Sequence, residues 1–303
     1  MLCGDRRLSC DPTFREASLI IKYGLQPLLF LSVLTAWFLT QTSLLTYPAI
    51  LLVVQVLLNL LEYWRPLRPD WRHSWREKSV LVVVYGLVFS FSVAVVAPVY
   101  AVSLEPMLEQ ARAALHLNIW PVHWPMIPQV FLAFFLSEFI WYWFHRAEHR
   151  WPVVWRFSGH GAHHSFKHLG AINAGANHPL EMFVLLVPSA IVELLFGGGL
   201  AVAGAAVLIL TQASIAHANL DLNHKVVGWL FTTNRYHIHH HSSVLDESNT
   251  NYGCAAILWD RVFGTFVDAD TLEAGSGPTE PTLWQKFIMP IHEPGDTQVS
   301  PSA

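Results

Sequence analysis

The sequence predicts an all-α integral membrane protein with four or more transmembrane helices and a helical cap that is rich in histidine. Composition supplies the first observation. The 303 residues are 53% hydrophobic and 13% charged, whereas soluble domains carry roughly 25% charged residues. The other two observations are apolar runs near the length of about 20 residues that crosses a bilayer, and the placement of 13 of the 17 histidines between positions 145 and 241.

Four apolar runs predict two helical hairpins. The polar residues Thr40 to Ser43 separate the first two runs by a tight turn, and Pro98 is expected to kink the third helix because proline lacks a backbone N–H. The N-terminus does not resemble a cleaved signal peptide, so we expect the first helix to remain attached. The four runs are residues 25–39 (extended upstream to 19), 44–61, 80–102 and 128–144.

A later apolar block covers residues 182–215 and is interrupted by Gly197-Gly198-Gly199. It predicts a further helix pair, which either spans the bilayer or enters it and returns. We expect a tail at residues 1–16, one membrane-embedded domain at 17–288 and a disordered tail at 289–303.

Lysine and arginine near the helix ends predict the orientation. Basic residues lie near the N-terminus and again after the second helix, and two crossings separate these groups, so both are expected in the cytoplasm. The same topology places every histidine cluster, and thus the cap, on the cytoplasmic face. The basic residues are Arg6, Arg7, Arg15 and Lys22, then Arg65, Arg68, Arg72, Arg76 and Lys78.

Composition also excludes some functions. A net charge of −4 argues against nucleic acid as a partner. The three cysteines, Cys3, Cys10 and Cys254, form no CxxC pair, which excludes a disulfide framework and a thiolate zinc site.

Three histidine motifs have the spacing of one helical face. They are His145-xxx-His149, His160-xx-His163-His164 and His237-x-His239-His240-His241. Side chains at positions i, i+3 and i+4 of a helix point to one spot. Three such sets on one membrane face predict a metal centre. His168 and His239 do not fit the i, i+3, i+4 spacing and are not expected as ligands, and His178 is expected to order a loop.

The number and type of ligands narrow the metal. A single zinc ion takes three or four protein ligands, so eight clustered histidines suit two ions. Imidazole binds zinc, copper, iron and nickel, and no thiolate is present here to favour zinc or Cu(I). A two-ion site with an all-histidine shell in a membrane protein indicates a redox metal.

Two other functions fit parts of the pattern. The stretch His145 to His149 also reads as HxxEH, the inverted zinc-hydrolase motif, in which Glu148 would activate a zinc-bound water. A histidine-rich metal transporter would place ionisable residues along an ion path in the membrane, where the apolar runs hold few, such as Glu138 and Glu193.

The two glutamates near the first motif are assigned expected roles in the redox-metal interpretation. Glu148 lies about 100° around the helix from His149, so we expect it either to point away from the ligand histidines, paired with Arg146 or Arg150 at the surface, or to lie behind a ligand histidine without binding the metal. Glu138, seven residues before the first histidine of the motif, is expected either to form an interhelical hydrogen bond or to orient a ligand imidazole.

Taken in order, HxxxH, HxxHH, an apolar hairpin and a final HxxHH resemble the fatty acid hydroxylase/sterol desaturase superfamily. The resemblance covers residues 55 to 267. Other stretches that resemble the family are Glu62-Tyr63-Trp64-Arg65-Pro66, His217-Ala218-Asn219, Asn249 to Gly253, and Trp259 to Thr265.

The resemblance implies a non-haem diiron enzyme that uses O2 to hydroxylate or desaturate a C–H bond of a lipid or sterol-like substrate in the bilayer. It implies a separate electron donor of ferredoxin or cytochrome b5 type with its reductase. Some members carry a second histidine four residues after the hairpin exit, where this chain has Asp221, so Asp221 or His224 would complete the metal shell. The implied iron ligands are His145, His149, His160, His163, His164, His217, His237, His240 and His241.

Overall fold

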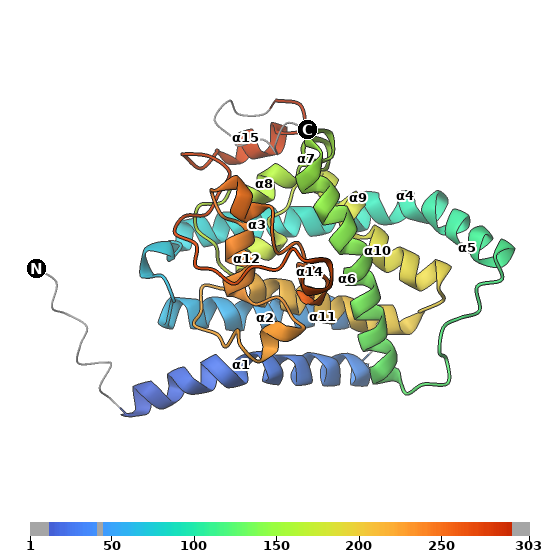
Figure 1. Ribbon diagram of the computed structural model, residues 1–303, viewed down its shortest axis with the longest axis horizontal. Helices are drawn as coiled ribbons and strands as arrows, with labels where there is room; N and C mark the ends of the chain where they lie inside the picture. Colours follow the sequence, from blue (N-terminus) through green and yellow to red (C-terminus); the bar gives the residue numbers. More distant parts are fainter. Residues whose placement is uncertain (1–11, 41–44, 293–303) are drawn as a thin grey trace, which may run out of the picture.

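The computed structural model describes residues 12–40 and 45–292, and every regular element within these ranges is helical (Figure 1). The predicted all-α class is therefore confirmed for the described part of the chain. The tail was expected to reach residue 16, whereas α1 begins at Pro12. Residues 1–11 lie outside the described residues.

Five helical segments are long and apolar enough to cross a bilayer, by length and composition. Their outer faces carry exposed leucine and valine side chains, such as Leu31, Leu52 and Val83, as expected for helices in contact with lipid. The segments are α1 (Pro12–Thr40), α2 (Thr46–Trp64), the run from α3 (Trp75–Phe91) through η3 (Ser92–Val96) and α4 (Ala97–Val102) to α5 (Leu104–Ala114), α6 (Met126–Arg150) and α11 (Leu200–His217).

The third segment differs from a simple kinked helix followed by a loop. A π turn, η3, precedes Pro98, α4 ends at Val102 as expected, and a further helix follows directly after Ser103. Residues 104–114, which lie between the third and fourth apolar runs, form α5, whose Arg112 packs against Gly197 at the turn of the later hairpin.

The apolar block after the cap histidines is asymmetric. Its first arm consists of α9 (Met182–Leu185), α10 (Val187–Ala190) and η6 (Ile191–Leu195). These residues span about 21 Å at 1.5 Å per residue, less than the roughly 30 Å of the hydrocarbon core. Gly197 and Gly199, with φ of 81° and 48°, make the turn into α11.

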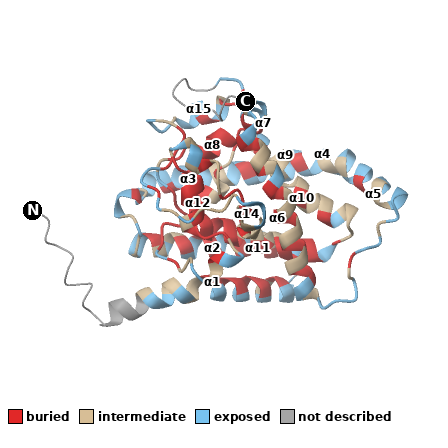
Figure 2. Cartoon of the chain, viewed as in Figure 1, coloured by how far each residue is buried: buried red, intermediate tan, exposed pale blue. Residues whose placement is uncertain are grey.

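α11 lies at the centre of the molecule (Figure 2), where it packs against α1, α2, α6 and η4 (Ala171–Gly175). Its sequence is apolar on all sides, which is typical of a helix enclosed by others. Its last residue, His217, ends among the short cap elements. α11 thus connects the membrane-spanning part of the molecule with the histidine cluster.

Short helices around the ends of α6 and α11 form the cap. α15 packs against α8, and Arg156 of α7 donates hydrogen bonds to the carbonyl oxygens of Pro290 and Ile291, just after α15, at 2.9 and 2.7 Å. Residues 289–292 are therefore held in place, although a disordered tail was expected from 289, and residues 293–303 lie outside the described residues. The cap elements are η2 (Pro69–Trp71), α7 (Pro152–Ser158), α8 (His160–His164), η4, η5 (Pro179–Glu181), η7 (Val227–Trp229), α12 (Asn234–His240), α13 (Leu245–Ser248), α14 (Leu258–Phe263) and α15 (Leu283–Ile288).

One buried carboxylate ties the cap to the membrane helices. Glu62, at the end of α2, accepts hydrogen bonds from the backbone N–H groups of Ala171 at 2.7 Å and Asn219 at 2.9 Å. The side chain of Asn219 accepts a hydrogen bond from the backbone N–H of Arg68 through Oδ1 and donates one to the carbonyl oxygen of Arg68 through Nδ2. Hydrogen bonds therefore join the end of α2, which carries Glu62, to the segment from His217 to Asn219 at the end of α11.

Candidate metal centre

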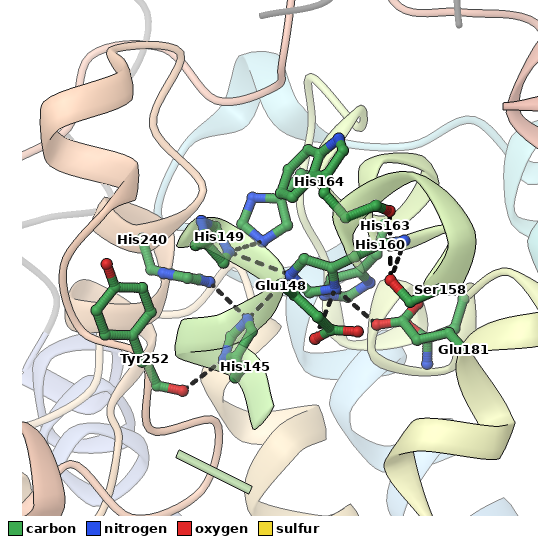
Figure 3. Close-up of polar contacts among 12 residues, drawn as sticks. His145, Glu148, His149, Ser158, His160, His163, His164, Glu181, His240 and Tyr252 are labelled. Atoms are coloured by element: carbon green, nitrogen blue, oxygen red, sulfur yellow. Dashed lines mark hydrogen bonds and ion pairs between the residues drawn. The ribbon is translucent and has the colours of Figure 1, made fainter. Parts of the chain in front are cut away.

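All nine histidines that were expected as ligands lie in two buried groups. In each group one ring nitrogen of every member lies within 4.8 Å of the others. We call them the five-histidine group, whose members are all labelled in Figure 3, and the four-histidine group. The first comprises His145, His149, His160, His164 and His240, and the second comprises His163, His217, His237 and His241.

Each HxxHH motif supplies both groups. On α8, His160 and His164 face the five-histidine group, whereas His163 faces the four-histidine group. The last motif, on α12 and the residue after it, divides in the same way, with only His240 in the five-histidine group. The rings of His164 and His241 stack at 4.3 Å between centroids, so the two groups adjoin.

The tautomers in the five-histidine group can be assigned from backbone acceptors. Nδ1 of His145 donates to the carbonyl oxygen of Tyr252, and Nδ1 of His240 donates to that of Thr250 at 2.8 Å. A carbonyl can only accept, so Nδ1 carries the proton and Nε2 carries a lone pair in both rings. Burial lowers the pKa of His240 well below its usual value, which leaves that ring neutral.

The two lone pairs face each other at 3.1 Å, the distance between Nε2 of His145 and Nε2 of His240. Nε2 of His160 lies 2.9 Å from Nε2 of His145. No proton is available between the first two atoms, so the arrangement is repulsive unless a cation lies among them. The spacing suits nitrogen ligands that bind a metal at about 2.0–2.1 Å. The residues therefore fit a metal ion.

The four-histidine group has the same character. Nδ1 of His217 donates to the carbonyl oxygen of Ala213 at 2.8 Å. Its Nε2 lies 3.0 Å from Nε2 of His237 and 3.2 Å from Nε2 of His163. Burial lowers the pKa of His163, His237 and His241 well below the usual value. Four neutral imidazoles thus present nitrogen lone pairs to one point.

Two buried carboxylates lie behind the five-histidine group. Nδ1 of His160 is 2.7 Å from Oε1 of Glu181 and 3.7 Å from Oε2 of Glu148 (Figure 3). Burial and the neighbouring charge of Glu148 raise the pKa of Glu181. Sequence reasoning missed Glu181, because only the histidine of the stretch from Asn177 to Glu181 was considered.

The expected surface ion pair of Glu148 with Arg146 or Arg150 is wrong, because Glu148 is fully buried. The alternative, a position behind one of the clustered histidines, agrees with the structure. Its carboxylate faces Nδ1 of His160, on the side of the ring opposite the converging Nε2 atoms. A general base for a metal-bound water must face the metal. The zinc-hydrolase interpretation of the HxxEH stretch therefore lacks its base in the required position.

A loop after α13 supports His145. The backbone N–H groups of Tyr252 and Gly253 donate to the carboxylate of Asp260, each at 2.7 Å. Glu138 accepts from the backbone N–H groups of Ala255 at 2.7 Å and Ala256 at 2.9 Å. Both roles expected for Glu138 are thus corrected, since it holds this loop and neither bridges two membrane helices nor orients an imidazole directly.

Neither residue proposed for a tenth ligand belongs to the two groups. Asp221 is exposed and pairs with Lys22 at 2.9 Å, and the half-buried ring of His224 lies beside Tyr236. His178 orders the chain as expected, because its Nδ1 accepts from the backbone N–H of Leu180 at 3.1 Å.

A largely apolar cavity of about 230 Å³ begins at the histidines. It is lined by members of both groups and by residues of the surrounding helices, among them α2, α3, α6, α9, α10 and α11. Binding sites for small molecules are typically concave and mostly apolar, with few polar groups. The histidines that line it are His145, His160, His163, His217 and His237.

Comparisons with known proteins agree with this geometry. The family model described as fatty acid hydroxylase matches residues 130–265. Ornithine lipid hydroxylase OlsE of Rhizobium tropici is 30% identical over 243 residues, which cover 76% of this chain and 69% of that protein. Alkylglycerol monooxygenases of Xenopus tropicalis and Homo sapiens are 28% and 27% identical, over 45% and 49% of this chain.

The aligned regions span 30% and 33% of those two monooxygenases. No solved structure matches the chain significantly. The match to the ornithine lipid hydroxylase covers more than two thirds of both chains, and the family model covers residues 130–265, which include all the histidine motifs. This chain therefore belongs to the fatty acid hydroxylase/sterol desaturase superfamily.

Proposed function

We propose that the protein is a membrane-bound diiron oxygenase that uses O2 to hydroxylate or desaturate a C–H bond of a lipid or sterol-like substrate. The observation that carries the proposal is the convergence of nine buried imidazoles in two adjoining groups at the end of an apolar cavity. The relatives are named as hydroxylases and monooxygenases of lipids, which supports the same class of reaction.

In this proposal each histidine group holds one iron ion. When bound, the iron pair supplies the activation of O2 and the removal of hydrogen from an unactivated carbon. The carbonyl oxygens of Tyr252, Thr250 and Ala213 fix the tautomers of three rings and so keep Nε2 free to bind metal.

The cavity positions the substrate and excludes water from the reacting carbon. Its walls are mainly aliphatic and aromatic side chains, among them Val88, Phe89, Leu185 and Leu210. An alkyl chain in such a site is held by burial of its surface and presented in a restricted geometry. The same walls keep bulk water away from the metal centre, which limits side reactions.

We also propose that the cap faces the cytoplasm, because the basic residues at the ends of α2 and α3 lie on the side of the histidines. The first arm of the later hairpin, residues 182–195, would enter the membrane and return. Electrons would come from a separate protein of ferredoxin or cytochrome b5 type with its reductase.

The test uses purified protein in detergent with bacterial lipid extract, an electron donor and isotopically labelled O2. We expect two iron ions per chain and a product that has gained one labelled oxygen atom or lost two hydrogen atoms. Turnover without O2, or by protein loaded with zinc in place of iron, would exclude an oxygenase. His240→Ala serves as the inactive control.

A further inference from the structure

The cavity that starts at the histidines extends along α11 into the membrane-spanning part of the molecule. Five residues of α11 line it: Ala206, Ile209, Leu210, Ala213 and His217. From Ala206 to His217 the helix rises about 16 Å, at 1.5 Å per residue. The cavity is therefore an elongated slot with the four-histidine group near one end.

Two hydrogen bonds fix how α2 aligns with α11 across this slot. Gln55 donates to Oγ of Ser214 at 2.8 Å, and the bond from Asn219 to Glu62 joins the two helices near their C-terminal ends. The helices thus run in the same direction. Counting eight residues back from Gln55 and from Ser214 brings Tyr47 level with Ala206, and Tyr47 also lines the cavity.

The slot ends just beyond Ala206. Val202 lies one turn further along the same face of α11 and is buried, but it does not line the cavity. A Cβ atom on Gly198 would lie 2.8 Å from Cγ2 of Val202 and 3.3 Å from Cγ1 of Val192. The hairpin turn and η6 therefore fill the space beneath Ala206.

We propose that Ala206, together with Tyr47, forms the floor of the cavity and limits the length of the alkyl chain that the protein binds. The inference rests on the proposed function, because it takes the cavity as the binding site of the lipid chain. The small side chain of Ala206 leaves the last part of the slot free for the terminal methyl group. The substrate is then an unbranched alkyl chain that binds tail first, with the reacting carbon at the histidines.

Ala206→Phe tests the floor directly. A phenyl ring in place of the methyl group fills the deep end of the slot, so we expect palmitate to bind about tenfold more weakly and decanoate to bind unchanged. Binding is measured by displacement of a fluorescent fatty acid from the purified full-length protein. Ala203→Phe is the matched control, because Ala203 lies on the same helix but is exposed and does not line the cavity.

Tyr47→Ala tests the same floor in the opposite direction. Removal of the ring deepens the slot, so arachidate should bind more tightly relative to palmitate than it does to the wild-type protein. A gain of this kind cannot arise from misfolding. If Ala206→Phe weakens palmitate and decanoate equally, or if Tyr47→Ala leaves the preference unchanged, Ala206 is not the floor.

The binding measurement needs neither O2 nor a reductant, which separates the two hypotheses. If the wild-type protein oxidises lipids and the Ala206→Phe variant binds palmitate as tightly as the wild type, the length limit is overturned and the oxygenase proposal stands. A protein whose chain-length preference follows the two substitutions, but which oxidises no lipid, supports the limit as a binding property and overturns the oxygenase.

Discussion

Replacement of Glu181 by glutamine removes a negative charge from Nδ1 of His160 and keeps the size of the side chain. The bond between them measures 2.7 Å, and both side chains are 2% exposed, so solvent screens the interaction little. Hydrogen bonds between an N–H and a carboxylate at such distances are about twice as strong as neutral ones. The carboxylate also raises the basicity of Nε2, which we propose binds metal.

Partners of this kind typically contribute about 10–100-fold in metal affinity, or roughly 1.4–2.7 kcal/mol. The amide oxygen of glutamine can still accept the Nδ1 proton, so Glu181→Gln should weaken iron binding about tenfold. Glu181→Ala leaves Nδ1 buried without an acceptor and should approach the upper end of the range.

The assay measures the iron retained by purified protein after dialysis against graded concentrations of a chelator. Glu193→Gln is the control, since Glu193 is an exposed carboxylate in the same apolar block. Glu181→Ala protein that retains iron as the wild type does would refute the role assigned to this bond. Equal losses in the Glu193 variant would point to a general defect of the membrane domain.

The remaining predictions concern the site, the loop, the topology and pH. His163→Ala and His240→Ala should each abolish turnover and lower iron content, while immunoblots find the protein still in the membrane. Glu138→Ala should lower the melting temperature, since two loop N–H groups lose their acceptor at about 1–3 kcal/mol each, whereas Glu138→Gln should change it little. In a cysteine-free background, Asp246→Cys and Ala113→Cys should react with impermeant maleimide from opposite sides of the membrane. Metal-free protein should lose its near-ultraviolet circular dichroism signal as the pH falls below about 6.5. Burial lowers the pKa of the α8 and α12 histidines in the folded chain. The unfolded chain therefore binds protons that the folded chain does not, and acid favours unfolding.

Helical spacing was sufficient to predict eight of the nine histidines that gather in the site, whereas His217 was expected only from the resemblance to the family. His145 and His149 share a face of α6 by periodicity alone, and the same holds within α8 and α12. The division of each HxxHH motif between two groups could not be predicted. It depends on the angle at which α8 and α12 approach each other, and that angle is set by contacts between residues distant in sequence.

Carboxylates were predicted less well than imidazoles. Spacing along α6 indicated that Glu148 points away from the face of His149, which is correct, but it could not decide between solvent and a buried position behind a ligand histidine. In the folded chain this side of the helix is buried, and η5 brings Glu181 to the same ring that Glu148 faces. Sequence periodicity gives the direction of a side chain from its helix axis, whereas burial depends on what packs against that face.

The two histidine groups differ in what lies behind them, and this difference bears on how charge is balanced. Nine neutral imidazoles would leave the charge of two metal cations uncompensated in a medium of low dielectric constant, which is costly. Glu148 and Glu181 are the buried carboxylates that contact a ring of the five-histidine group. Behind the four-histidine group, the described contact is the neutral carbonyl oxygen of Ala213 with His217. A metal ion in the five-histidine group would therefore be partly neutralised through His160, and one in the four-histidine group would keep more of its positive charge beside the cavity.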